Sequence, residues 1–335
     1  YNALRVPLFI IAKIAGLFNE KVGETFRGRR SLFDIIQNKL KDIPEDAQRI
    51  WIHASSMGEY EQALPLVNEL LSRNSSTWIV LTLFSPSVMK HISDPGGRIA
   101  LFYLPFDSNQ NVKRFLDAAH PNAAIVIRHD IWPNYQWHLQ KRGIPSILAD
   151  ASISDKRIKS AQRLSAYYKQ VLNTFSAVCA VSEQQADRLK MVYSEHEHIF
   201  TCGDTRFDRV RERALDKSKI SNIIDSKLFA KERCLVVGSS WEEDERVIYP
   251  AISRAFRQYD DFSLIIAPHE LTPEHLSSIE TYFDRDGIEL VRWSRFDNEH
   301  KKSTRILLVD TIGLLANLYT LGLSLIHISE PTRPT

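Results

Sequence analysis

The 335-residue sequence predicts an α/β fold with two Rossmann-like domains, of which the second is incomplete. Three observations support this prediction. Apolar runs rich in Ile, Val and Leu alternate with helical patterns, which is typical of a parallel, doubly wound sheet. A polar, Lys-rich stretch at residues 213–232 then interrupts the alternation and is interpreted as a connection. Finally, the alternation restarts at Arg233 but stops before a second half is complete.

The first domain is expected at residues 43–212. Its apolar runs predict seven strands, at residues 49–55, 77–85, 98–107, 122–132, 145–154, 177–182 and 198–208. The helical patterns between them cover residues 59–73, 87–94, 109–120, 135–143, 160–175 and 183–193. In such a fold the carboxyl ends of the strands share one edge of the sheet, where ligands bind.

The partial second domain is expected at residues 233–322. Four strands are predicted, at residues 233–240, 262–269, 288–293 and 305–311. Helical patterns follow at residues 242–259, 272–287 and 313–322. The second sheet should therefore belong to the same class as the first and offer a second set of strand ends to a ligand.

Residues 1–42 are expected to form a membrane-associating segment. The apolar part, residues 3–18, contains Arg5 and Lys13 and is shorter than the roughly 20 residues of a spanning helix. Residues 1–41 carry eight Lys or Arg against three acidic residues, a net charge of +5, which suits an anionic membrane surface. A helix docked on the protein's own core is the alternative. A cleaved signal peptide is disfavoured, because no small-residue cleavage site follows the apolar run.

The composition excludes several classes of function. A net charge of +2 argues against bulk nucleic-acid binding. The cysteines Cys179, Cys202 and Cys234 are far apart and lack zinc-ligand spacing, which indicates a reducing compartment. Residues 196–198 read His-Glu-His, but no third ligand is adjacent, so we expect a solvated loop and no metal site. Glycine-rich phosphate loops of the Rossmann or P-loop type do not occur in the sequence.

Residues 323–335, LSLIHISEPTRPT, differ in character from the rest of the chain. They resemble the translation of a transposase-type sequencing adapter. We therefore expect a non-native tail after Gly322, with a natural carboxyl-terminal extension as the alternative. An uninterrupted genomic reading across this codon would contradict the expectation.

The first strand-to-helix junction, HASSMGE, contains the strongest candidate for a catalytic group. Glu59 would lie in the first turn of a helix, near the positive end of its dipole. Gly58 would let the backbone turn sharply and leave room for a substrate. The alternative is a capping box, because Ser56 as N-cap with Glu59 three residues later fits that template. Spacing alone leaves both interpretations open.

Two further junctions of the first domain carry charged candidates. Asp130 follows the fourth apolar strand and precedes a helix that should begin at Pro133. Its alternative role is that of an ordinary acid at a helix amino terminus. Arg206 lies between Asp204 and Asp208, and its alternative role is a local ion pair with them.

The junctions of the second domain give weaker signals. Gly238 and Ser239 belong to a small-residue turn between a strand and an acidic helix, which is a modest indication of an anion site. Pro268 and His269 end the next strand, and their pattern alone is ambiguous.

Taken together, these junctions resemble those of a known family. The segments HASSMGE, IWPN, GDTRFD, GSSWEEDE, APHE and DTIGLLANLY resemble, in the same order, motifs of the 3-deoxy-D-manno-octulosonic acid (Kdo) transferases of lipopolysaccharide synthesis. The resemblance extends from residue 1 to about residue 322. The residues within these motifs are similar to the version found in Bacteroidetes-type bacteria. No single motif is decisive, but the ordered set is highly specific.

The resemblance implies a GT-B glycosyltransferase. It implies inverting transfer of Kdo from CMP-Kdo to the acylated, phosphorylated disaccharide precursor of lipid A, with no metal or other cofactor. The family's general base falls on Glu59, and its transition-state stabilising residues fall on Asp130 and Arg206. Its CMP contacts fall on Pro268, His269, Ile312, Gly313 and Leu314. Together with the basic amino-terminal segment, this implies a place at the cytoplasmic face of the inner membrane.

Several positions depart from the family's pattern. Many members have Glu in the position of Asp130, Arg in that of His269 and Glu in that of Leu314. The family's glycine-rich turn and its His-Asn nucleotide loop are expected after residue 322 and do not occur. Two alternatives therefore stay open: another GT-B nucleotide-sugar enzyme, such as an epimerase of UDP-N-acetylglucosamine, or an inactive membrane-bound fragment.

Overall fold

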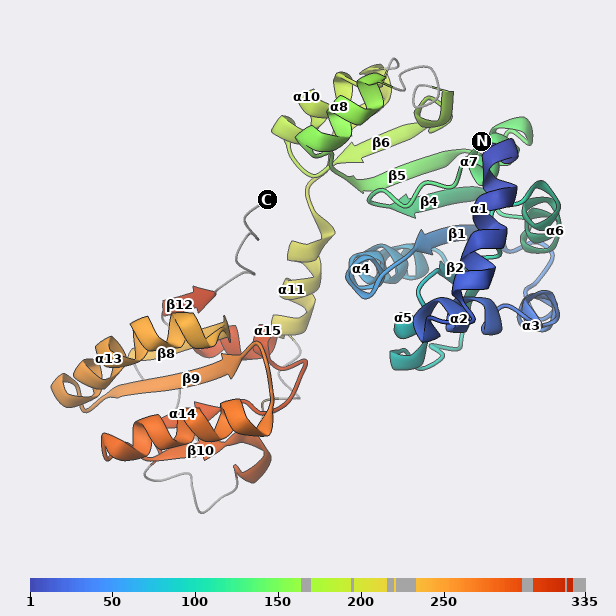
Figure 1. Ribbon diagram of the computed structural model, residues 1–335. Coiled ribbons are helices and arrows are strands. Elements are labelled where there is room, and N and C mark those ends of the chain that lie inside the picture. Colours follow the sequence, from blue (N-terminus) through green and yellow to red (C-terminus); the bar gives the residue numbers. More distant parts are fainter. Residues whose placement is uncertain are drawn as a thin grey trace. The chain divides into compact units, whose positions relative to one another are not determined.

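The computed structural model divides the chain into two compact units, Tyr1–Arg209 and Val210–Thr335 (Figure 1). It describes residues 1–163, 170–193, 196–215, 220, 233–296, 304–322 and 324–327. Each unit contains one parallel sheet with helices packed against it. The predicted α/β class with two Rossmann-like domains is therefore confirmed.

The first unit is built on a seven-stranded sheet with the order β3-β2-β1-β4-β5-β6-β7, in which all neighbours are parallel. Its strands are β1 (Gln48–Ala54), β2 (Thr77–Leu83), β3 (Ile99–Tyr103), β4 (Ala123–Ile127), β5 (Ser146–Ala151), β6 (Ala177–Ala180) and β7 (Ile199–Thr201). All seven expected strands are present, although most end several residues earlier than expected. The order reverses between β1 and β4, which makes this pair the topological switch point of the sheet.

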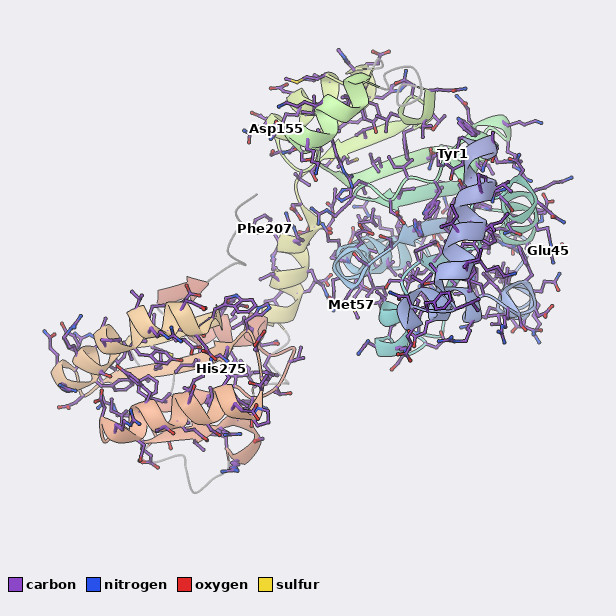
Figure 2. The ribbon with its side chains drawn as sticks, in the orientation of Figure 1. Tyr1, Glu45, Met57, Asp155, Phe207 and His275 are labelled. Carbon is purple, nitrogen blue, oxygen red and sulfur yellow. The ribbon has the colours of Figure 1, made fainter. Side chains whose placement is uncertain are left out.

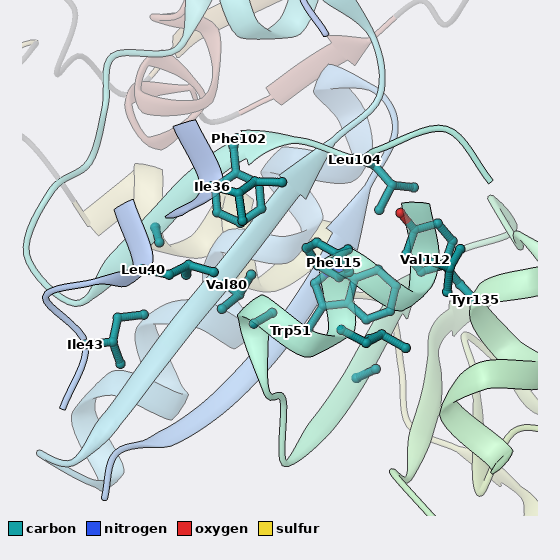
Figure 3. Packing of buried hydrophobic residues seen from close by; sticks show 14 of the residues in the cluster. Ile36, Leu40, Ile43, Trp51, Val80, Phe102, Leu104, Val112, Phe115 and Tyr135 are labelled. Carbon is teal, nitrogen blue, oxygen red and sulfur yellow. The ribbon is translucent and has the colours of Figure 1, made fainter. Parts of the chain in front are cut away.

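Helices cover both faces of this sheet, because alternate residues of each strand point to opposite sides. On β1, Trp51 packs into a layer formed with α3 (Leu32–Leu40), α6 (Asn109–Ala119) and α7 (Pro133–Lys141). Figure 3 shows this layer, in which the rings of Trp51 and Phe115 lie 5.1 Å apart. Ile50 and Ile52 point the other way, into a second layer with α4 (Met57–Arg73) and α5 (Pro86–His91). Further along the chain lie α8 (Asp155–Arg163), α10 (Glu183–Lys190), the short η1 (His196–His198) and α11 (Thr205–Leu215).

The amino-terminal segment forms α1 (Asn2–Ala15) and α2 (Glu20–Arg27) and packs on the first unit. Phe9 of α1 lies edge-on against Phe26 and Phe106, with ring centroids 5.4 and 5.1 Å apart. Other large apolar side chains of the segment are exposed, namely Val6, Ile10, Ile11, Ile14, Leu17 and Phe18. The docked-helix alternative therefore accounts for part of the segment, while membrane association stays a prediction. Within the described residues, none of the helices combines the length and apolar character needed to span a bilayer.

Arg29 attaches this amino-terminal segment to the sheet. Its buried guanidinium donates hydrogen bonds to the backbone carbonyls of Leu104 and Phe84, which follow β3 and β2, at 2.8 and 2.9 Å. The rings of Phe84, Tyr103 and Phe106 surround it. Burial lowers the pKa of Arg29 to about 10, which leaves the group charged at neutral pH. A buried cation with these partners holds residues 1–42 firmly on the first unit.

The second unit contains a five-stranded parallel sheet with the order β10-β11-β9-β8-β12. Its strands are β8 (Arg233–Ser240), β9 (Phe262–Pro268), β10 (Leu290–Arg292), β11 (Ile306–Leu308) and β12 (Ser324–His327). Its helices are α13 (Glu242–Gln258), α14 (Pro273–Arg285) and α15 (Leu315–Leu318), with the 3₁₀ turns η3 (Trp293–Arg295) and η5 (Tyr319–Leu321). Two buried apolar clusters lie on the two faces of the sheet.

This sheet has one strand more than expected. Four strands were predicted and are present, but β12 falls in the stretch expected to be a non-native tail. It pairs with β8 from Ser324 opposite Leu235 to His327 opposite Gly238. A physical reason is that β8 would otherwise present an unpaired edge, which any short extended segment can satisfy. The origin of residues 323–335 stays a prediction. Apart from Ile220, residues 216–232 of the expected connection lie outside the described residues.

Candidate active site

The carboxyl ends of β1 and β4 carry two of the expected catalytic residues. These strands are neighbours, with His53 opposite Val126 in the register. Glu59 lies in the first turn of α4, whose start is marked by Met57 in Figure 2. Asp130 lies between β4 and α7. Both side chains therefore lie at the switch point of the sheet, where doubly wound folds bind ligands.

Glu59 combines parts of the two roles that spacing left open. Ser56 is the N-cap of α4 and its hydroxyl accepts from the backbone N–H of Glu59 at 3.3 Å. The carboxylate does not complete the capping box on Ser56. Instead its Oε2 accepts from both the backbone N–H and the hydroxyl of Ser55, each at 2.6 Å. Among the described residues nothing donates to Oε1, so one oxygen fixes the side chain and the other is available.

The expected reason for a glycine at position 58 is wrong in one respect. Gly58 lies inside the first turn of α4 and is not among the residues with positive φ, so no sharp turn requires it. A Cβ atom built on Gly58 would meet nothing within 4 Å. Open space beside the backbone, next to Glu59, is the feature that remains.

Asp130 is held by two side chains that sequence reasoning did not assign. His53 Nε2 lies 2.9 Å from Asp130 Oδ2, and Trp132 Nε1 donates to the same oxygen at 3.0 Å. On the other side of the His53 ring, the hydroxyl of Thr82 lies 3.0 Å from Nδ1 and accepts from Trp51 Nε1 at 2.8 Å. The backbone carbonyl oxygen of Thr82 lies 3.2 Å from the same nitrogen, so Nδ1 has both a carbonyl and a hydroxyl as neighbours. A chain of hydrogen bonds thus runs from the buried core to the carboxylate.

The pKa of Asp130 lies below its usual value for a definite reason. Burial acts to raise the pKa, but the hydrogen bond and attraction of His53, with the bond from Trp132, outweigh burial. Asp130 is not the capping acid of α7. That role belongs to Asp107, whose carboxylate accepts from the backbone N–H groups of Asn134 and Tyr135 at 3.3 and 3.2 Å. The helix does begin at Pro133, as predicted.

Arg206 forms the local ion pair that was its alternative role. It lies in the first turn of α11, and its Nε is 2.9 Å from Asp204 Oδ2. The pairing raises the pKa of Arg206, and it lowers the pKa of Asp204 by more than burial raises it. In the ranges that the structure describes, no hydrogen bond joins Arg206 to Glu59 or Asp130. Its proposed catalytic role stays a prediction.

The start of α11 is fixed by Asp150, which the sequence analysis treated only as part of a strand. The carboxylate of Asp150 accepts from the backbone N–H and the hydroxyl of Thr205 and from Gln62 Nε2 at 2.9 Å. Its backbone has φ of 50°, in the left-handed region that is uncommon outside glycine. This arrangement joins α4, β5 and α11, and so it positions Arg206 relative to the rest of the first unit.

In the second unit, the residues expected to hold CMP lie at the carboxyl ends of β9 and β11, which are neighbours. His269 is exposed and its ring stacks on Trp241, with centroids 4.2 Å apart. The backbone N–H of His269 donates to the carbonyl of Ser240 at 2.9 Å, which joins the ends of β9 and β8. Pro268 is buried directly before this contact.

The loop after β11 presents its three expected residues in different ways. Ile312 is 89% exposed, and Gly313 has φ of 93° with open space where a Cβ would lie. Leu314, in contrast, is buried in the core of the unit. The side chain of Leu314 therefore serves the core, while the side chain of Ile312 is exposed.

Gly238 and Ser239 do not form the open turn that was expected. They are the last part of β8, where the register with β9 shifts and Ser239 has φ of 55°. A Cβ on Gly238 would lie 2.2 Å from the hydroxyl of Tyr319 and 2.9 Å from Leu315. Any larger residue at this position would displace the side chains of Tyr319 and Leu315. The following helix, α13, has four acidic residues in its first turn, which disfavours an anion there.

The second unit contains another histidine–carboxylate pair, next to the ends of β8 and β9, which the sequence analysis did not predict. His275, labelled on α14 in Figure 2, lies with Nε2 2.8 Å from Glu245 Oε2 and Nδ1 3.0 Å from the carbonyl oxygen of Glu270. The hydroxyl of Ser240 donates to Glu245 Oε1 at 2.7 Å. Burial acts to lower the pKa of His275, but Glu245 and the carbonyl raise it above the usual value. The pair links the β8–α13 junction to the β9–α14 loop.

With this geometry in hand, the sequence can be compared with known proteins. Residues 26–209 match the sequence profile of the family described as "3-Deoxy-D-manno-octulosonic-acid transferase (kdotransferase)". The match covers more than half of the chain and ends at the last residue of the first unit. The chain belongs to the Kdo transferase family.

Curated Kdo transferases match beyond the first unit as well. A 3-deoxy-D-manno-octulosonic acid transferase of Haemophilus influenzae is 26% identical over 278 residues, which cover 81% of this chain and 63% of that protein. A probable mitochondrial 3-deoxy-D-manno-octulosonic acid transferase of Arabidopsis thaliana is 27% identical, over 82% of this chain and 61% of that protein. The chain thus spans about three fifths of the length of these Kdo transferases.

Solved structures agree on the fold. A UDP-GlcNAc 2-epimerase from Neisseria meningitidis, determined with UDP-GlcNAc bound, has a TM-score of 0.58 at 14% identity and covers 84% of this chain and 77% of its own. At this identity the likeness concerns architecture alone. It agrees with the two-domain, GT-B-like arrangement expected of a Kdo transferase.

Proposed function

We propose that the full-length parent of this chain transfers Kdo from CMP-Kdo to the lipid A precursor with inversion, and that Glu59 is the general base. The observation that carries the proposal is the carboxylate of Glu59 at the end of β1. Ser55 holds Oε2 with two hydrogen bonds, while Oε1 receives none from the described residues. Membership of the Kdo transferase family supports the choice of reaction.

The chemistry explains why such a carboxylate is useful. A sugar hydroxyl is a poor nucleophile, so a positioned base must take its proton as the new C–O bond forms. The two bonds from Ser55 restrict the side chain of Glu59 to one orientation, which lowers the cost of reaching the reactive geometry. The open space beside Gly58 leaves room for a sugar ring to approach. In the proposal, Oε1 accepts the proton and Oε2 remains bound to Ser55.

The remaining roles follow the family's pattern. Asp130, fixed by His53 and Trp132, and Arg206 would stabilise the charge that develops at the transferred sugar and the leaving group. The stacked Trp241 and His269 offer a flat surface to the cytosine ring of CMP, and the Ile312–Gly313 loop would lie beside the nucleotide. We propose that no metal takes part. Within the described residues, no three His, Cys, Asp or Glu side chains gather in a metal-binding arrangement.

We also propose that the protein works at the cytoplasmic face of the inner membrane. The exposed apolar side chains of residues 6–18 and the net charge of +5 in residues 1–41 support this. An apolar surface beside basic residues binds an anionic interface through burial and attraction together.

The test is the substitution Glu59→Gln in the full-length parent. Glutamine keeps an oxygen that accepts the two bonds from Ser55, so the fold should persist while the base is lost. We expect transfer from CMP-Kdo to fall by about 10² to 10⁴. The matched control is Glu69→Gln, an exposed residue of the same helix, which should leave transfer unchanged. Near-normal turnover of Glu59→Gln would leave Glu59 with a structural role only, and turnover of UDP-N-acetylglucosamine in place of CMP-Kdo would favour the epimerase alternative.

A further inference from the structure

A pocket of about 430 Å³ opens in the first unit beside the loop that carries Asp130. Its size lies within the range of small-molecule sites, about 300–1,000 Å³. It is lined by residues of the β4–α7 loop, the end of β5, α8 and α10, together with Tyr1, and none of these lining residues is acidic. Trp132, which donates a hydrogen bond to Asp130, forms part of its wall.

The floor of the pocket is apolar and deep. Leu148, Leu172 and Leu189 line it and are buried in the core of this part of the unit, and Ile153 adds a partly buried side chain. Apolar surface that stays in contact with water is costly, at roughly 25 cal/mol per Å². A pocket of this composition therefore gains most from an occupant with a hydrocarbon part.

One polar group next to this floor has no hydrogen-bond partner among the described residues. The side chain of Tyr193 lines the pocket and is only 4% exposed, and its hydroxyl is enclosed by protein atoms without such a partner. A buried hydroxyl without a partner is rare in folded proteins and is destabilising. An oxygen atom on the occupant reaches this hydroxyl only if the ring of Tyr193 turns toward the pocket.

The mouth of the pocket is positively charged. Arg128 and Arg157 both line it, and in the part of the chain that the structure describes neither guanidinium lies within ion-pair distance of a carboxylate. Arg128 is close enough to Asp150 and Asp204 to act to lower the pKa of each, whereas Arg157 is exposed. Arg128 has φ of 63°, a conformation that is uncommon for a residue with a side chain. Burial lowers the pKa of the neighbouring His129, and the charges of Arg157 and Arg128 lower it further. The Nδ1 atom of His129 is likewise buried, with no hydrogen-bond partner in the described ranges of the chain.

We propose that this pocket binds one acyl chain of the lipid acceptor, with the acceptor's phosphate at Arg128 and Arg157. The inference rests on the proposed function, because it assigns the pocket to the acceptor of the same reaction. An apolar floor and two guanidinium groups with no acidic residue in the lining together fit an acylated, anionic molecule. The pocket adjoins Trp132, so an acyl chain seated here would hold the rest of the acceptor near Asp130.

The first experiment measures binding of n-alkyl phosphates of four to twelve carbons to this chain by calorimetry, below the concentration at which they form micelles. Affinity should rise by about fourfold for each added methylene group until the pocket is full. Inorganic phosphate and the alkanol of equal length should each bind at least tenfold more weakly than the alkyl phosphate. Affinity that is independent of chain length, or equal for phosphate alone, would overturn the proposal.

Two variants locate the binding. Ile153→Trp should fill the pocket and shorten the longest chain that still gains affinity, and Arg157→Gln should weaken every alkyl phosphate without changing the gain per methylene. The control is Ile10→Ser on the exposed surface of α1. Loss of binding in Ile10→Ser with none in Ile153→Trp would move the site to α1 and reject the pocket.

A second readout separates this inference from the proposed reaction. In the full-length parent, Ile153→Trp should raise the KM for the acylated acceptor at least tenfold and leave kcat for a deacylated, water-soluble acceptor unchanged. If the parent transfers no Kdo but the alkyl phosphate series behaves as expected, the proposed function fails and the pocket stands. If transfer is normal and Ile153→Trp has the wild-type KM, the pocket assignment fails and the proposed function stands.

Discussion

Each of the two units contains a buried histidine paired with a carboxylate. The two pairs have nearly equal nitrogen–oxygen distances but differ in exposure and in their neighbours. Nε2 of His53 lies 2.9 Å from Asp130, and Nε2 of His275 lies 2.8 Å from Glu245. In the first pair the carboxylate side chain is 28% exposed, whereas in the second both side chains are nearly enclosed. A contact distance alone therefore does not say whether such a pair serves the fold or a ligand.

The surroundings of the two rings explain the difference. Nδ1 of His53 lies near the Thr82 hydroxyl, which can donate or accept, and near the Thr82 carbonyl oxygen, which only accepts, while Nε2 lies beside Asp130. The ring of His275 faces two acceptors, a carbonyl oxygen and the Glu245 carboxylate, which favours the doubly protonated, charged form. The first pair aims an accessible carboxylate at the switch point of its sheet. The second is an enclosed ion pair that joins two loops, and such pairs are costly to break.

The largest expected difference between the two pairs is the loss of stability when each carboxylate is removed in turn. Glu245→Ala leaves the charged ring of His275 and the hydroxyl of Ser240 buried without a partner, and we expect it to reduce the free energy of unfolding of the second unit by about 3–5 kcal/mol. Asp130→Ala removes the acceptor of one ring hydrogen at a partly exposed site, and about 1 kcal/mol is expected.

Urea unfolding of the full chain, followed with a probe in each unit, measures both losses. Glu243→Ala is the matched control, because Glu243 lies in the same first turn of α13 and is exposed. That variant should change stability by less than about 0.5 kcal/mol. Equal losses for Glu245→Ala and Asp130→Ala would show that enclosure does not distinguish the two pairs.

The two pairs should also lose their contributions to folding stability at opposite ends of the pH scale. The pKa of His275 is raised above 6.5 in the folded unit, so its contribution is complete below about pH 6.5 and is lost as the pH rises through the raised value. The pKa of Asp130 is lowered below 3.8, so its contribution is complete above that value and is lost only as the pH falls through the lowered pKa.

The measurement is the free energy of unfolding of the second unit from pH 6 upward in the wild type and in His275→Gln. The difference between the two should shrink with rising pH, by at most about 1.4 kcal/mol per pH unit. Other histidines titrate equally in both proteins and cancel in this difference. A difference that grows toward alkaline pH would mean that the ring of His275 is neutral in the folded state.

The fold was largely predictable because it depends on local patterns. Each of the seven strands of the first sheet contains a short apolar run, and strands such as β1 and β2 are buried almost continuously, as in a parallel sheet with both faces covered. The end of the third strand was placed too late, at Asp107, because a polar side chain that binds a neighbouring helix resembles a strand continuation in sequence. The strand β12 was not predicted, since its pairing depends on the free edge of β8.

The candidate site was predictable only in part. Glu59 and Asp130 were found from their places at strand ends, which a parallel fold makes meaningful. His53 lies in the same HASSMGE segment as Glu59, but its partner is 77 residues away and only the pairing of β1 with β4 brings them together. Gly238 was assigned to an anion site because its packing against Tyr319 depends on a contact from the far end of the unit. Contacts of this kind can be predicted only after the order of the strands is known.

The smallest expected effect is a change in the pKa of Asp130, and it tests the first pair most directly. His53→Phe removes the hydrogen bond and attraction that lower this pKa, while burial and the Trp132 bond remain, so the pKa should rise. Carbon-13 NMR of the labelled Asp130 carboxyl group measures it directly.

Thr82→Val tests whether the hydrogen-bond chain behind His53 matters to the carboxylate or only to the fold. It keeps the shape of the side chain but leaves Trp51 Nε1 without its acceptor, which should cost about 1 kcal/mol of stability. The Asp130 pKa should move much less than in His53→Phe, because the ring of His53 still donates from Nε2. Equal shifts in the two variants would mean that Thr82 sets the orientation of the ring. In that case a side chain in the core would control the pKa of Asp130. Glu245 differs, because its partners Ser240 and His275 lie beside the two loops that the pair joins.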